Sequence, residues 1–384
     1  MRKYSRYSLG GCSRTLAGVS SAPLRVFLNA SALPARPAGA GVYTLELARA
    51  LAARDELALT VAAPAGYAIS GASMVRSPEA HPALRSAWEQ ARMPRHLAAA
   101  DVYHGAHFAT PMHSRVPRVA TVHDLTFYRL PRRYSRGHRW YYRALARTAT
   151  CAERLIVPSR AVAADAVRFL GYPPDRIRVV AEAPRAGLAA ASPKEVTTTL
   201  AELGIAQPYL LCVGTVEPGK RAVDAVRALA LLRERGQAVQ LVLAGHTGPL
   251  SGPLRQEAGR LGVADRVAFA GYVGDEQLAA LYTGATALVF PSLHEGFGLP
   301  PLEAMACGTP VISTRAQAMR EVLADAAFFV PLRDPGAIAD AAESLLRQPS
   351  LRADWAARGL EHAAQFSWAK AAEETLAVYR ELTG

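Results

Sequence analysis

The residues whose types and spacing could best support binding or catalysis lie at positions 292–310, which read SLHEGFGLPPLEAMACGTP. Glu295 and Glu303 flank a Gly-Phe-Gly turn, which leads into an expected helix with Pro300 and Pro301 in its first turn, where proline is tolerated. Carboxylates accept hydrogen bonds from sugar or ribose hydroxyls, whereas glycine amides and a helix N-terminus favour an anion such as a diphosphate. The pattern therefore indicates a ligand with both hydroxyls and phosphates; two solvated surface glutamates are the simpler alternative.

These residues must be positioned by an alternation of short apolar runs and amphipathic stretches that begins at residue 24. Apolar runs such as 24–30, 118–122, 209–214 and 287–292 predict buried strands, and the stretches between them predict helices. Strands separated by helices form parallel sheets, whose ligands bind beyond the carboxyl ends of the strands. The run that ends just before Glu295 thus places this glutamate at a ligand-binding edge.

The alternation breaks once and then restarts, which predicts two α/β domains. A chain of 384 residues is long enough for two or three domains. The expected division is a disordered basic tail, an N-terminal Rossmann-like domain, a linker, a C-terminal Rossmann-like domain and a final helix. Their bounds are residues 1–22, 23–185, 186–207, 208–365 and 366–384 respectively.

The charge is uneven along the chain. The first 185 residues carry 27 Lys and Arg against 11 Asp and Glu, whereas the remainder carries 17 against 21. A surface for anionic lipid headgroups or lipid-linked phosphates is one interpretation, and arginines scattered over a solvated face are the other. A nucleic-acid partner is disfavoured because aromatic-interleaved basic motifs are absent from the sequence. The densest arginine cluster comprises Arg129, Arg132, Arg133, Arg136, Arg139, Arg143 and Arg147.

The cysteines and the apolar content favour a cytoplasmic protein. The four cysteines form no CxxC pair, which is typical of free thiols in a reducing compartment. The first 22 residues lack the apolar core of at least about seven residues that a signal peptide needs. Residues 57–75 carry no charge, but Pro64, Gly66 and Gly71 interrupt them, so they do not predict a membrane span.

Residues 292–310 resemble the hallmark of retaining glycosyltransferases of family 4, in which seven residues separate two glutamates. The resemblance covers the chain from about residue 24 to the end. It implies the GT-B fold, in which two Rossmann-like, doubly wound parallel-sheet domains face each other across a cleft and the last helix returns toward the N-terminal domain. Other matching segments are 39–51 (GAGVYTLELARAL), 120–131 (ATVHDLTFYRLP), 154–171 (RLIVPSRAVAADAVRFLG), 208–220 (PYLLCVGTVEPGK) and 242–248 (VLAGHTG).

The resemblance implies roles for individual residues. Glu295 would bind the donor sugar, Glu303 the nucleotide ribose, and Lys220 the donor diphosphate, where charge develops as the glycosidic bond breaks. His123, at the carboxyl end of the run 118–122, would lie at the donor sugar; a core or capping histidine is the alternative. Further donor-binding positions are Gly41, Gly214, Thr215, Gly296, Phe297, Gly298 and Leu299.

Several features leave alternatives open. Gly39 and Gly41 could let the backbone approach a diphosphate or acceptor, or could be turn glycines without a ligand. Many relatives carry Arg where this chain has Gly219, followed by Arg221, so a second phosphate-binding cation is missing or displaced. Residues 179–187 read VVAEAPRAG, where relatives often have a Pro-Asn-Gly turn.

The activity that the resemblance implies is metal-independent, retaining transfer of a hexose from a nucleotide-diphosphate sugar. Asp-x-Asp, the metal-holding motif of the other major glycosyltransferase fold, does not occur in the sequence. No cofactor is expected beyond the nucleotide sugar as co-substrate, with GDP-mannose the first guess and UDP-linked donors next. The acceptor would be a glycan or a lipid-linked glycan in cell-envelope polysaccharide synthesis, and the arginine cluster would contact an anionic membrane. A scaffold that binds a nucleotide sugar or partner without transfer, and a phosphorylase or epimerase of similar fold, remain alternatives.

Overall fold

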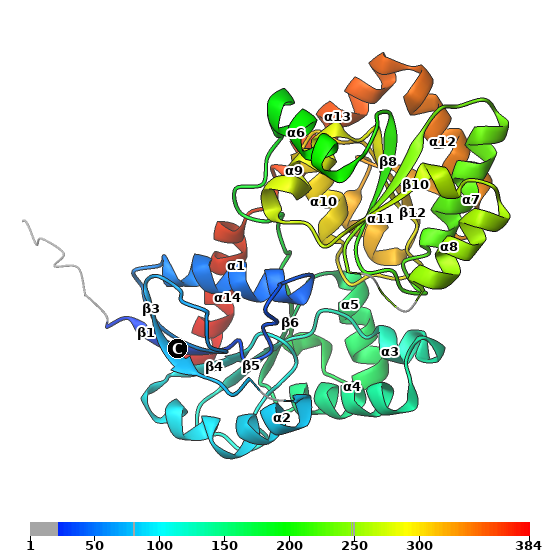
Figure 1. Cartoon of the computed structure of the whole chain (residues 1–384). Coiled ribbons are helices and arrows are strands. Elements are labelled where there is room, and N and C mark those ends of the chain that lie inside the picture. The colour runs from blue at the N-terminus through cyan, green and yellow to red at the C-terminus, as the bar shows by residue number, and fades with distance from the viewer. Residues whose placement is uncertain (1–21, 80, 247, 249) are drawn as a thin grey trace, which may run out of the picture.

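Two α/β domains, each built on one parallel sheet, make up the described part of the chain (Figure 1). The computed structural model describes residues 22–79, 81–246, 248 and 250–384, with the backbone alone of Arg133. The predicted tail lies outside the described residues apart from its last position. Every strand pairing is parallel in both sheets, which confirms the predicted fold class.

The N-terminal sheet has the strand order β3-β2-β1-β4-β5-β6-β7. Its direction of winding reverses between β1 and β4, which leaves a crevice at their carboxyl ends. The strands are β1 (Leu24–Asn29), β2 (Leu57–Ala63), β3 (Ala72–Arg76), β4 (Val102–Gly105), β5 (Arg118–Thr121), β6 (Arg154–Val157) and β7 (Ile177–Val179). The helices are α1 (Ala40–Ala52), α2 (Pro82–Ala91), η1 (Met93–Ala99), α3 (Thr126–Arg129), α4 (Arg136–Ala149), α5 (Arg160–Asp165) and its π-helical continuation η3 (Ala166–Leu170).

The C-terminal sheet repeats this plan with the order β10-β9-β8-β11-β12-β13 and a reversal between β8 and β11. Its strands are β8 (Tyr209–Val213), β9 (Gln240–Ala244), β10 (Val267–Gly271), β11 (Ala287–Phe290), β12 (Val311–Thr314) and β13 (Phe328–Val330). Its helices are α7 (Ala222–Glu234), α8 (Ser251–Arg260), α9 (Asp275–Gly284), α10 (Leu299–Ala306), α11 (Gln317–Leu323), α12 (Pro335–Arg347) and α13 (Pro349–Ala363).

Two connections join the domains. Helix α14 (Trp368–Thr383) leaves the C-terminal domain and lies beside α1, so the C-terminus ends on the N-terminal domain (Figure 1). Its buried residues Trp368, Ala372 and Tyr379 belong to the N-terminal core. The expected linker is not wholly irregular, because residues 193–203 form helix α6 (Pro193–Leu203) with a capping box at Ser192 and Glu195. The segment without regular structure is therefore 180–192.

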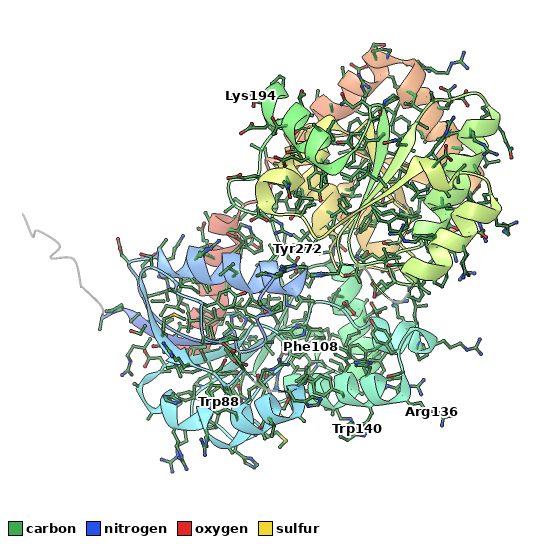
Figure 2. All side chains as sticks on the ribbon, viewed as in Figure 1. Trp88, Phe108, Arg136, Trp140, Lys194 and Tyr272 are labelled. Carbon is green, nitrogen blue, oxygen red and sulfur yellow. The ribbon has the colours of Figure 1, made fainter. Side chains whose placement is uncertain are left out.

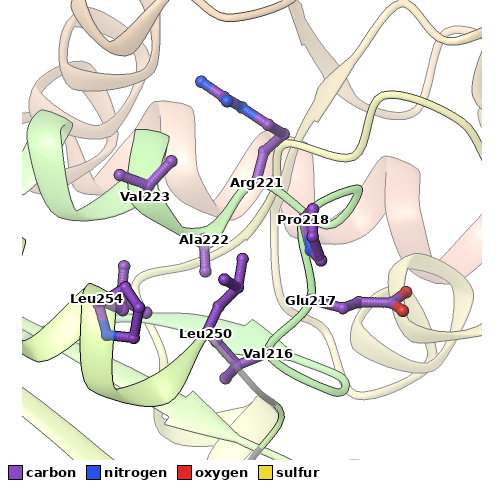
Figure 3. Close-up of a pocket in the computed structure, with 9 residues that line it drawn as sticks. Val216, Glu217, Pro218, Arg221, Ala222, Val223, Leu250 and Leu254 are labelled. Carbon is purple, nitrogen blue, oxygen red and sulfur yellow. The ribbon is translucent and has the colours of Figure 1, made fainter. Parts of the chain in front are cut away.

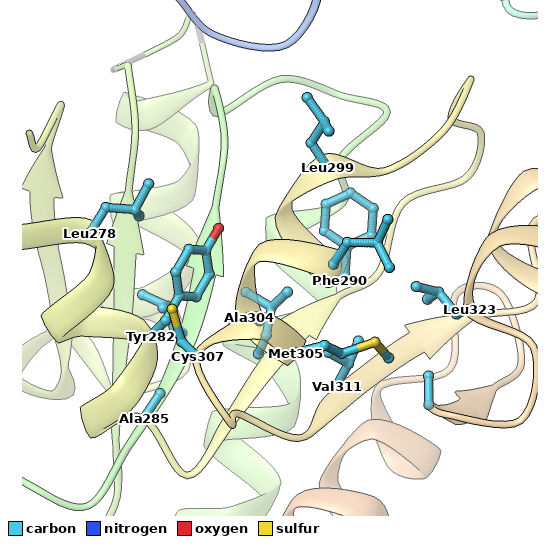
Figure 4. Close-up of a cluster of buried hydrophobic side chains, with 14 of the residues drawn as sticks. Leu278, Tyr282, Ala285, Phe290, Leu299, Ala304, Met305, Cys307, Val311 and Leu323 are labelled. Atoms are coloured by element: carbon cyan, nitrogen blue, oxygen red, sulfur yellow. The ribbon is translucent and has the colours of Figure 1, made fainter. Parts of the chain in front are cut away.

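Helix α10 is anchored in a dense hydrophobic cluster of the C-terminal domain (Figure 4). Leu302 and Met305 are fully buried, and α10 packs near β11 and β12. Full burial of each such side chain contributes about 1.5–3 kcal/mol. A helix that is apolar nearly all round is buried rather than solvent-facing, so this cluster fixes the position of Glu303 within the same helix.

Candidate active site

A cleft of about 360 Å³ separates the carboxyl ends of the two sheets. The N-terminal domain and the segment that follows it contribute Ala38, Gly39, Ala40, Val42, His123, Asp124, Glu182 and Arg185. The C-terminal domain contributes Val213, Gly214, Thr215, Glu217, Lys220, Glu295, Gly296, Phe297, Gly298, Leu299, Pro300 and Glu303. The structure thus brings together every predicted site residue except Gly41.

Lys220 and Glu295 meet at the reversal point of the C-terminal sheet. Lys220 ends the loop that follows β8, and Glu295 lies in the loop that follows the neighbouring strand β11. The Lys220 Nζ donates to Glu295 Oε1 at 2.9 Å and lies 5.2 Å from the centre of the Phe290 ring. Both side chains are largely shielded from solvent. Weak screening by water strengthens the attraction between them, and it would also strengthen the attraction of Lys220 for an anionic ligand.

Glu303 is buried and bonded at both carboxylate oxygens. Arg185 Nε donates to Oε1 at 2.9 Å, and the Tyr282 hydroxyl donates to Oε2 at 2.9 Å. Burial raises the pKa of Glu303, and the charge of Arg185 is the largest opposing influence. Arg185 also donates to Asp275 Oδ1 at 2.7 Å. Sequence reasoning missed Arg185 as a site residue, although the departure at 179–187 pointed to this segment.

The glycine turn between the two glutamates packs against the N-terminal domain. A Cβ on Gly296 would lie 1.8 Å from the backbone oxygen of His123, so a side chain does not fit there. Gly298 caps α10 with a φ of +100°, a conformation that favours glycine. The side chains of Phe297 and Leu299 belong to the buried cluster of the C-terminal domain. The turn therefore has one face in the cleft and the other in the core.

His123 lines the cleft, but both of its ring nitrogens are engaged within the N-terminal domain. Nδ1 lies 3.1 Å from Glu182 Oε1, and Nε2 lies 2.9 Å from the backbone oxygen of Ala106. The Tyr43 ring packs edge-on against the His123 ring, with 4.6 Å between the ring centres. The His107 ring stacks on the His123 ring, with 5.6 Å between the ring centres. In this arrangement His123 offers a sugar hydroxyl no unengaged ring nitrogen, and its predicted contact with the donor stays a prediction.

The first turn of the N-terminal domain reaches the cleft through Gly39 rather than Gly41. Gly39 has a φ of +51° and open space beside its Cα. Gly41 is already inside α1, where an added Cβ would lie 3.2 Å from Pro34 and 3.4 Å from Pro37. Gly41 therefore packs against the preceding turn and is not among the residues that line the cleft, and its predicted contact with the donor stays a prediction.

Arg221 does not replace the cation that many relatives carry at the position of Gly219. Its backbone has a φ of +55°, and its Nε donates to Asp224 at 2.8 Å in the first turn of α7. It lines a separate pocket of about 240 Å³ with Val216, Leu250 and Leu254 (Figure 3). Among the described residues that line the cleft, the arginine and lysine side chains are those of Lys220 and Arg185.

The arginine cluster is divided by the fold. Arg129 forms an ion pair with the fully buried Asp165, and Arg143 lies over the Tyr128 ring, so both contribute to intradomain contacts. Arg132, Arg136 and Arg147 are exposed on and beside α4. Trp140 of the same helix is 74% exposed and projects from the domain near Arg136 (Figure 2).

The described part of the chain contains neither a metal-binding cluster nor a membrane-spanning helix. No group of three or more His, Cys, Asp or Glu in it is arranged to hold a metal ion. No described helix combines the length and the apolar character that crossing a bilayer requires. Of the cysteines in the described range, Cys151, Cys212 and Cys307 are free thiols.

Two doubly wound domains with such a cleft between them define the GT-B class of glycosyltransferase. The sequence model described as Glycosyltransferase Family 4 matches residues 37–182, and that described as Glycosyl transferases group 1 matches residues 199–362. The chain is 33% identical over 284 residues to the O-antigen chain mannosyltransferase B of Escherichia coli, covering 73% of this chain and 74% of that protein. The chain belongs to the group 1 glycosyltransferases of family 4.

Other relatives and solved structures agree on family and fold. A D-inositol 3-phosphate glycosyltransferase 2 of Catenulispora acidiphila is 36% identical over 240 residues, or 59% of this chain and 56% of that protein. Anabaena HepE in complex with UDP-glucose superposes with a TM-score of 0.75 at 19% identity, over 94% of this chain and 100% of that chain. WaaG, a glycosyltransferase involved in lipopolysaccharide biosynthesis, gives a TM-score of 0.72 at 20% identity, over 94% of this chain and 100% of that chain. At these identities the structural matches support the fold.

Proposed function

We propose that this protein transfers a hexose from a nucleotide-diphosphate sugar, with retention of configuration and without a metal ion, to a glycan or lipid-linked acceptor. The observation that carries the proposal is the convergence of Lys220, Glu295 and Glu303 in one cleft, at the reversal point of the C-terminal sheet. One cation and two carboxylates at this point suit a ligand that has phosphates at one place and hydroxyls at others.

In the proposed arrangement the donor diphosphate lies near Lys220 and the amino end of α10, and the sugar lies toward Glu295. Lys220 stabilises the charge that develops on the leaving diphosphate, in place of a divalent ion. On the N-terminal side of the cleft, Glu182 accepts from His123 and Asp124 accepts from the Thr126 amide at 2.8 Å. By the family resemblance, attack comes from the face of the leaving group, with the donor phosphate helping to deprotonate the acceptor, rather than by double displacement through an enzyme carboxylate.

Mannose from GDP-mannose is the first candidate for the donor, supported by the relative named O-antigen chain mannosyltransferase B. UDP-linked sugars are the second, because the structural neighbour HepE binds UDP-glucose. The names of O-antigen chain mannosyltransferase B and of WaaG, which is involved in lipopolysaccharide biosynthesis, support a role in cell-envelope polysaccharide synthesis. A scaffold that binds nucleotide sugars without transfer is the alternative, and the absence of Arg at Gly219 is the feature that favours it.

The donor class is tested by thermal-shift measurements with GDP-, UDP-, ADP- and dTDP-sugars in the presence of EDTA. One class is expected to raise the melting temperature of the wild type, because a ligand at 100 times its Kd adds about 2.7 kcal/mol of stability. Glu303→Ala and Lys220→Ala are expected to lose this response. Stabilisation only when a divalent ion replaces EDTA would contradict metal independence, and stabilisation without any transfer to acceptor glycans would favour the scaffold.

We further propose that the exposed part of the arginine cluster contacts an anionic membrane surface. Trp140 and the neighbouring arginines combine an interfacial aromatic side chain with positive charge, and each arginine near such a surface contributes about 1 kcal/mol. The double variant Arg132→Glu/Arg136→Glu is expected to lose flotation with phosphatidylserine vesicles, whereas Arg352→Glu/Arg358→Glu on α13 keeps it. Binding that is insensitive to salt and to both variants would refute the contact.

A further inference from the structure

Glu303, which the proposed function assigns to the donor ribose, keeps part of its hydrogen-bonding capacity free. An ionised carboxylate has about four lone-pair sites. Arg185 Nε and the Tyr282 hydroxyl occupy one site on each oxygen of Glu303. Two sites therefore remain, which is the number that the adjacent 2′- and 3′-hydroxyls of a ribose would fill.

Only the ionised carboxylate can accept both bonds as charge-assisted hydrogen bonds, and burial opposes its ionisation. Glu303 is 2% exposed, and burial raises its pKa. Arg185 opposes this effect both by its charge and by its hydrogen bond. A protonated Glu303 would lose one acceptor site and its charge, so its hydrogen bonds to a pair of ribose hydroxyls would be weaker.

The other charged and titratable groups around this site come from α9, α1 and the end of α10. Asp275 and Tyr282 belong to α9, and the Asp275 charge adds to the raised pKa of Glu303. Cys307 follows α10, and burial foremost, together with the Glu303 charge, raises its pKa to about 12. Glu46 of α1 has a pKa that burial raises and that Arg49 and Arg185 lower. Among these groups Arg185 is the cation that contacts Glu303.

Arg185 is itself held in place for this contact. Its side chain is 17% exposed, and it joins Glu303 to Asp275 through two different nitrogens. It lies in the irregular segment 180–192 between the domains, one residue after Pro184, whose carbonyl accepts from Trp368 Nε1 at 2.8 Å. The hydrogen bond from Trp368, at the start of α14, thus fixes the backbone next to Arg185, and Asp275 of α9 helps to fix the guanidinium.

We propose that Arg185 is a positioning residue for the donor ribose, which holds the Glu303 carboxylate ionised and oriented so that it selects ribonucleotides over nucleotides that lack the 2′- and 3′-hydroxyls. This inference rests on the proposed function, because it requires a nucleotide donor in the cleft. It assigns a task to the segment 179–187, where the chain departs from its relatives.

The test compares a ribonucleoside diphosphate with its 2′,3′-dideoxy analogue by isothermal titration calorimetry. The base is the one that stabilises the wild type in the thermal-shift experiment. The wild type is expected to bind the ribonucleotide tighter by about tenfold or more, since the dideoxy analogue has no hydroxyl to donate to the charged carboxylate. The ratio of the two dissociation constants is measured within each variant, so a general loss of affinity cancels.

Arg185→Met is expected to lose more of this preference at about pH 6 than at about pH 8.5. Removal of the cation raises the Glu303 pKa further, so a larger share of the carboxyl is protonated at the lower pH than at the higher. The wild type keeps its preference at both values. Arg185→Lys, which keeps the charge, is expected to restore most of the preference at the lower pH.

Arg160→Met provides the matched control. This substitution removes another ion pair between the domains, the one between Arg160 and Glu321. The Arg160 side chain is 83% exposed and does not line the cleft. This variant is expected to keep the wild-type preference. A preference that Arg185→Met leaves intact at both pH values, or affinities that fall equally for both nucleotides at every pH, would overturn the inference. Failure of the wild type to bind either nucleotide would instead count against the proposed function.

Discussion

Lys220→Ala is expected to reduce kcat/KM for sugar transfer by about a hundredfold to a thousandfold, the range typical for the loss of one group that stabilises developing charge. The Lys220 Nζ lies 2.9 Å from Glu295 Oε1 in a site with little solvent, so water screens its charge only weakly. The substitution removes the cation from the proposed diphosphate site and leaves Glu295 without its ion-pair partner. The measurement is release of nucleoside diphosphate under saturating acceptor.

A lysine elsewhere on the same protein separates this effect from a general loss of charge. Lys370 is exposed at the start of α14 and does not line the cleft. Lys370→Ala is expected to keep wild-type activity and melting temperature. Wild-type turnover in Lys220→Ala, with the variant folded, would show that the leaving diphosphate is stabilised by another group and would remove the central cation from the mechanism.

Gly296→Ala is expected to lower kcat/KM by about a hundredfold, because displacement of a catalytic group by about 1 Å can have an effect of that size. The added Cβ would lie 1.8 Å from the His123 backbone oxygen and 2.9 Å from the His123 carbonyl carbon, and backbone atoms cannot swing aside as a flexible side chain can. The carbonyl of Gly296 also accepts from Ser159 Oγ at 2.7 Å. The turn that carries Glu295 must therefore shift away from the N-terminal domain.

The same substitution is expected to lower stability by about 1–3 kcal/mol, as overpacking usually does. Gly259 offers the matched control, since it lies inside α8 with no heavy atom within 4 Å of an added Cβ. Gly259→Ala is expected to stabilise the protein by about 0.5–1 kcal/mol and to leave transfer unchanged. Thermal unfolding and small-angle scattering report the stability and the domain separation. A fully active Gly296→Ala with unchanged scattering would mean that the two domains do not meet at this turn in solution.

The local sequence was informative wherever one short segment contains both a structural signal and a chemical one. Apolar runs bounded by glycine and proline predict the strands of both sheets except β3, and the run before Glu295 places that glutamate correctly at a strand's carboxyl end. The turn between Glu295 and Glu303 depends on glycine conformation and on proline in the first helical turn, which are local properties.

Elements with weak or mixed periodicity were harder to predict. Strand β3 was missed because it lies at the sheet edge with only part of its surface covered, so it lacks an apolar run. Helix α4 stands out in the sequence as an arginine cluster rather than as a helix, because most of its surface is polar and only Leu145, Ala146 and Ala149 are buried. Helix α6 lies inside the predicted linker, although its capping box is a local signal for a helix.

The sequence by itself thus determined the two-domain parallel-sheet fold, the family and the motif with two glutamates, since periodicity, turn residues and helix capping act over a few residues. The tertiary structure decided which cations and glycines belong to the cleft. Arg221 is bonded three residues away to Asp224, whereas Arg185 reaches Glu303 across 118 positions of the chain. Such partners are chosen by the packing of distant elements and by the burial of charge, and neither is a property of the segment that carries the residue.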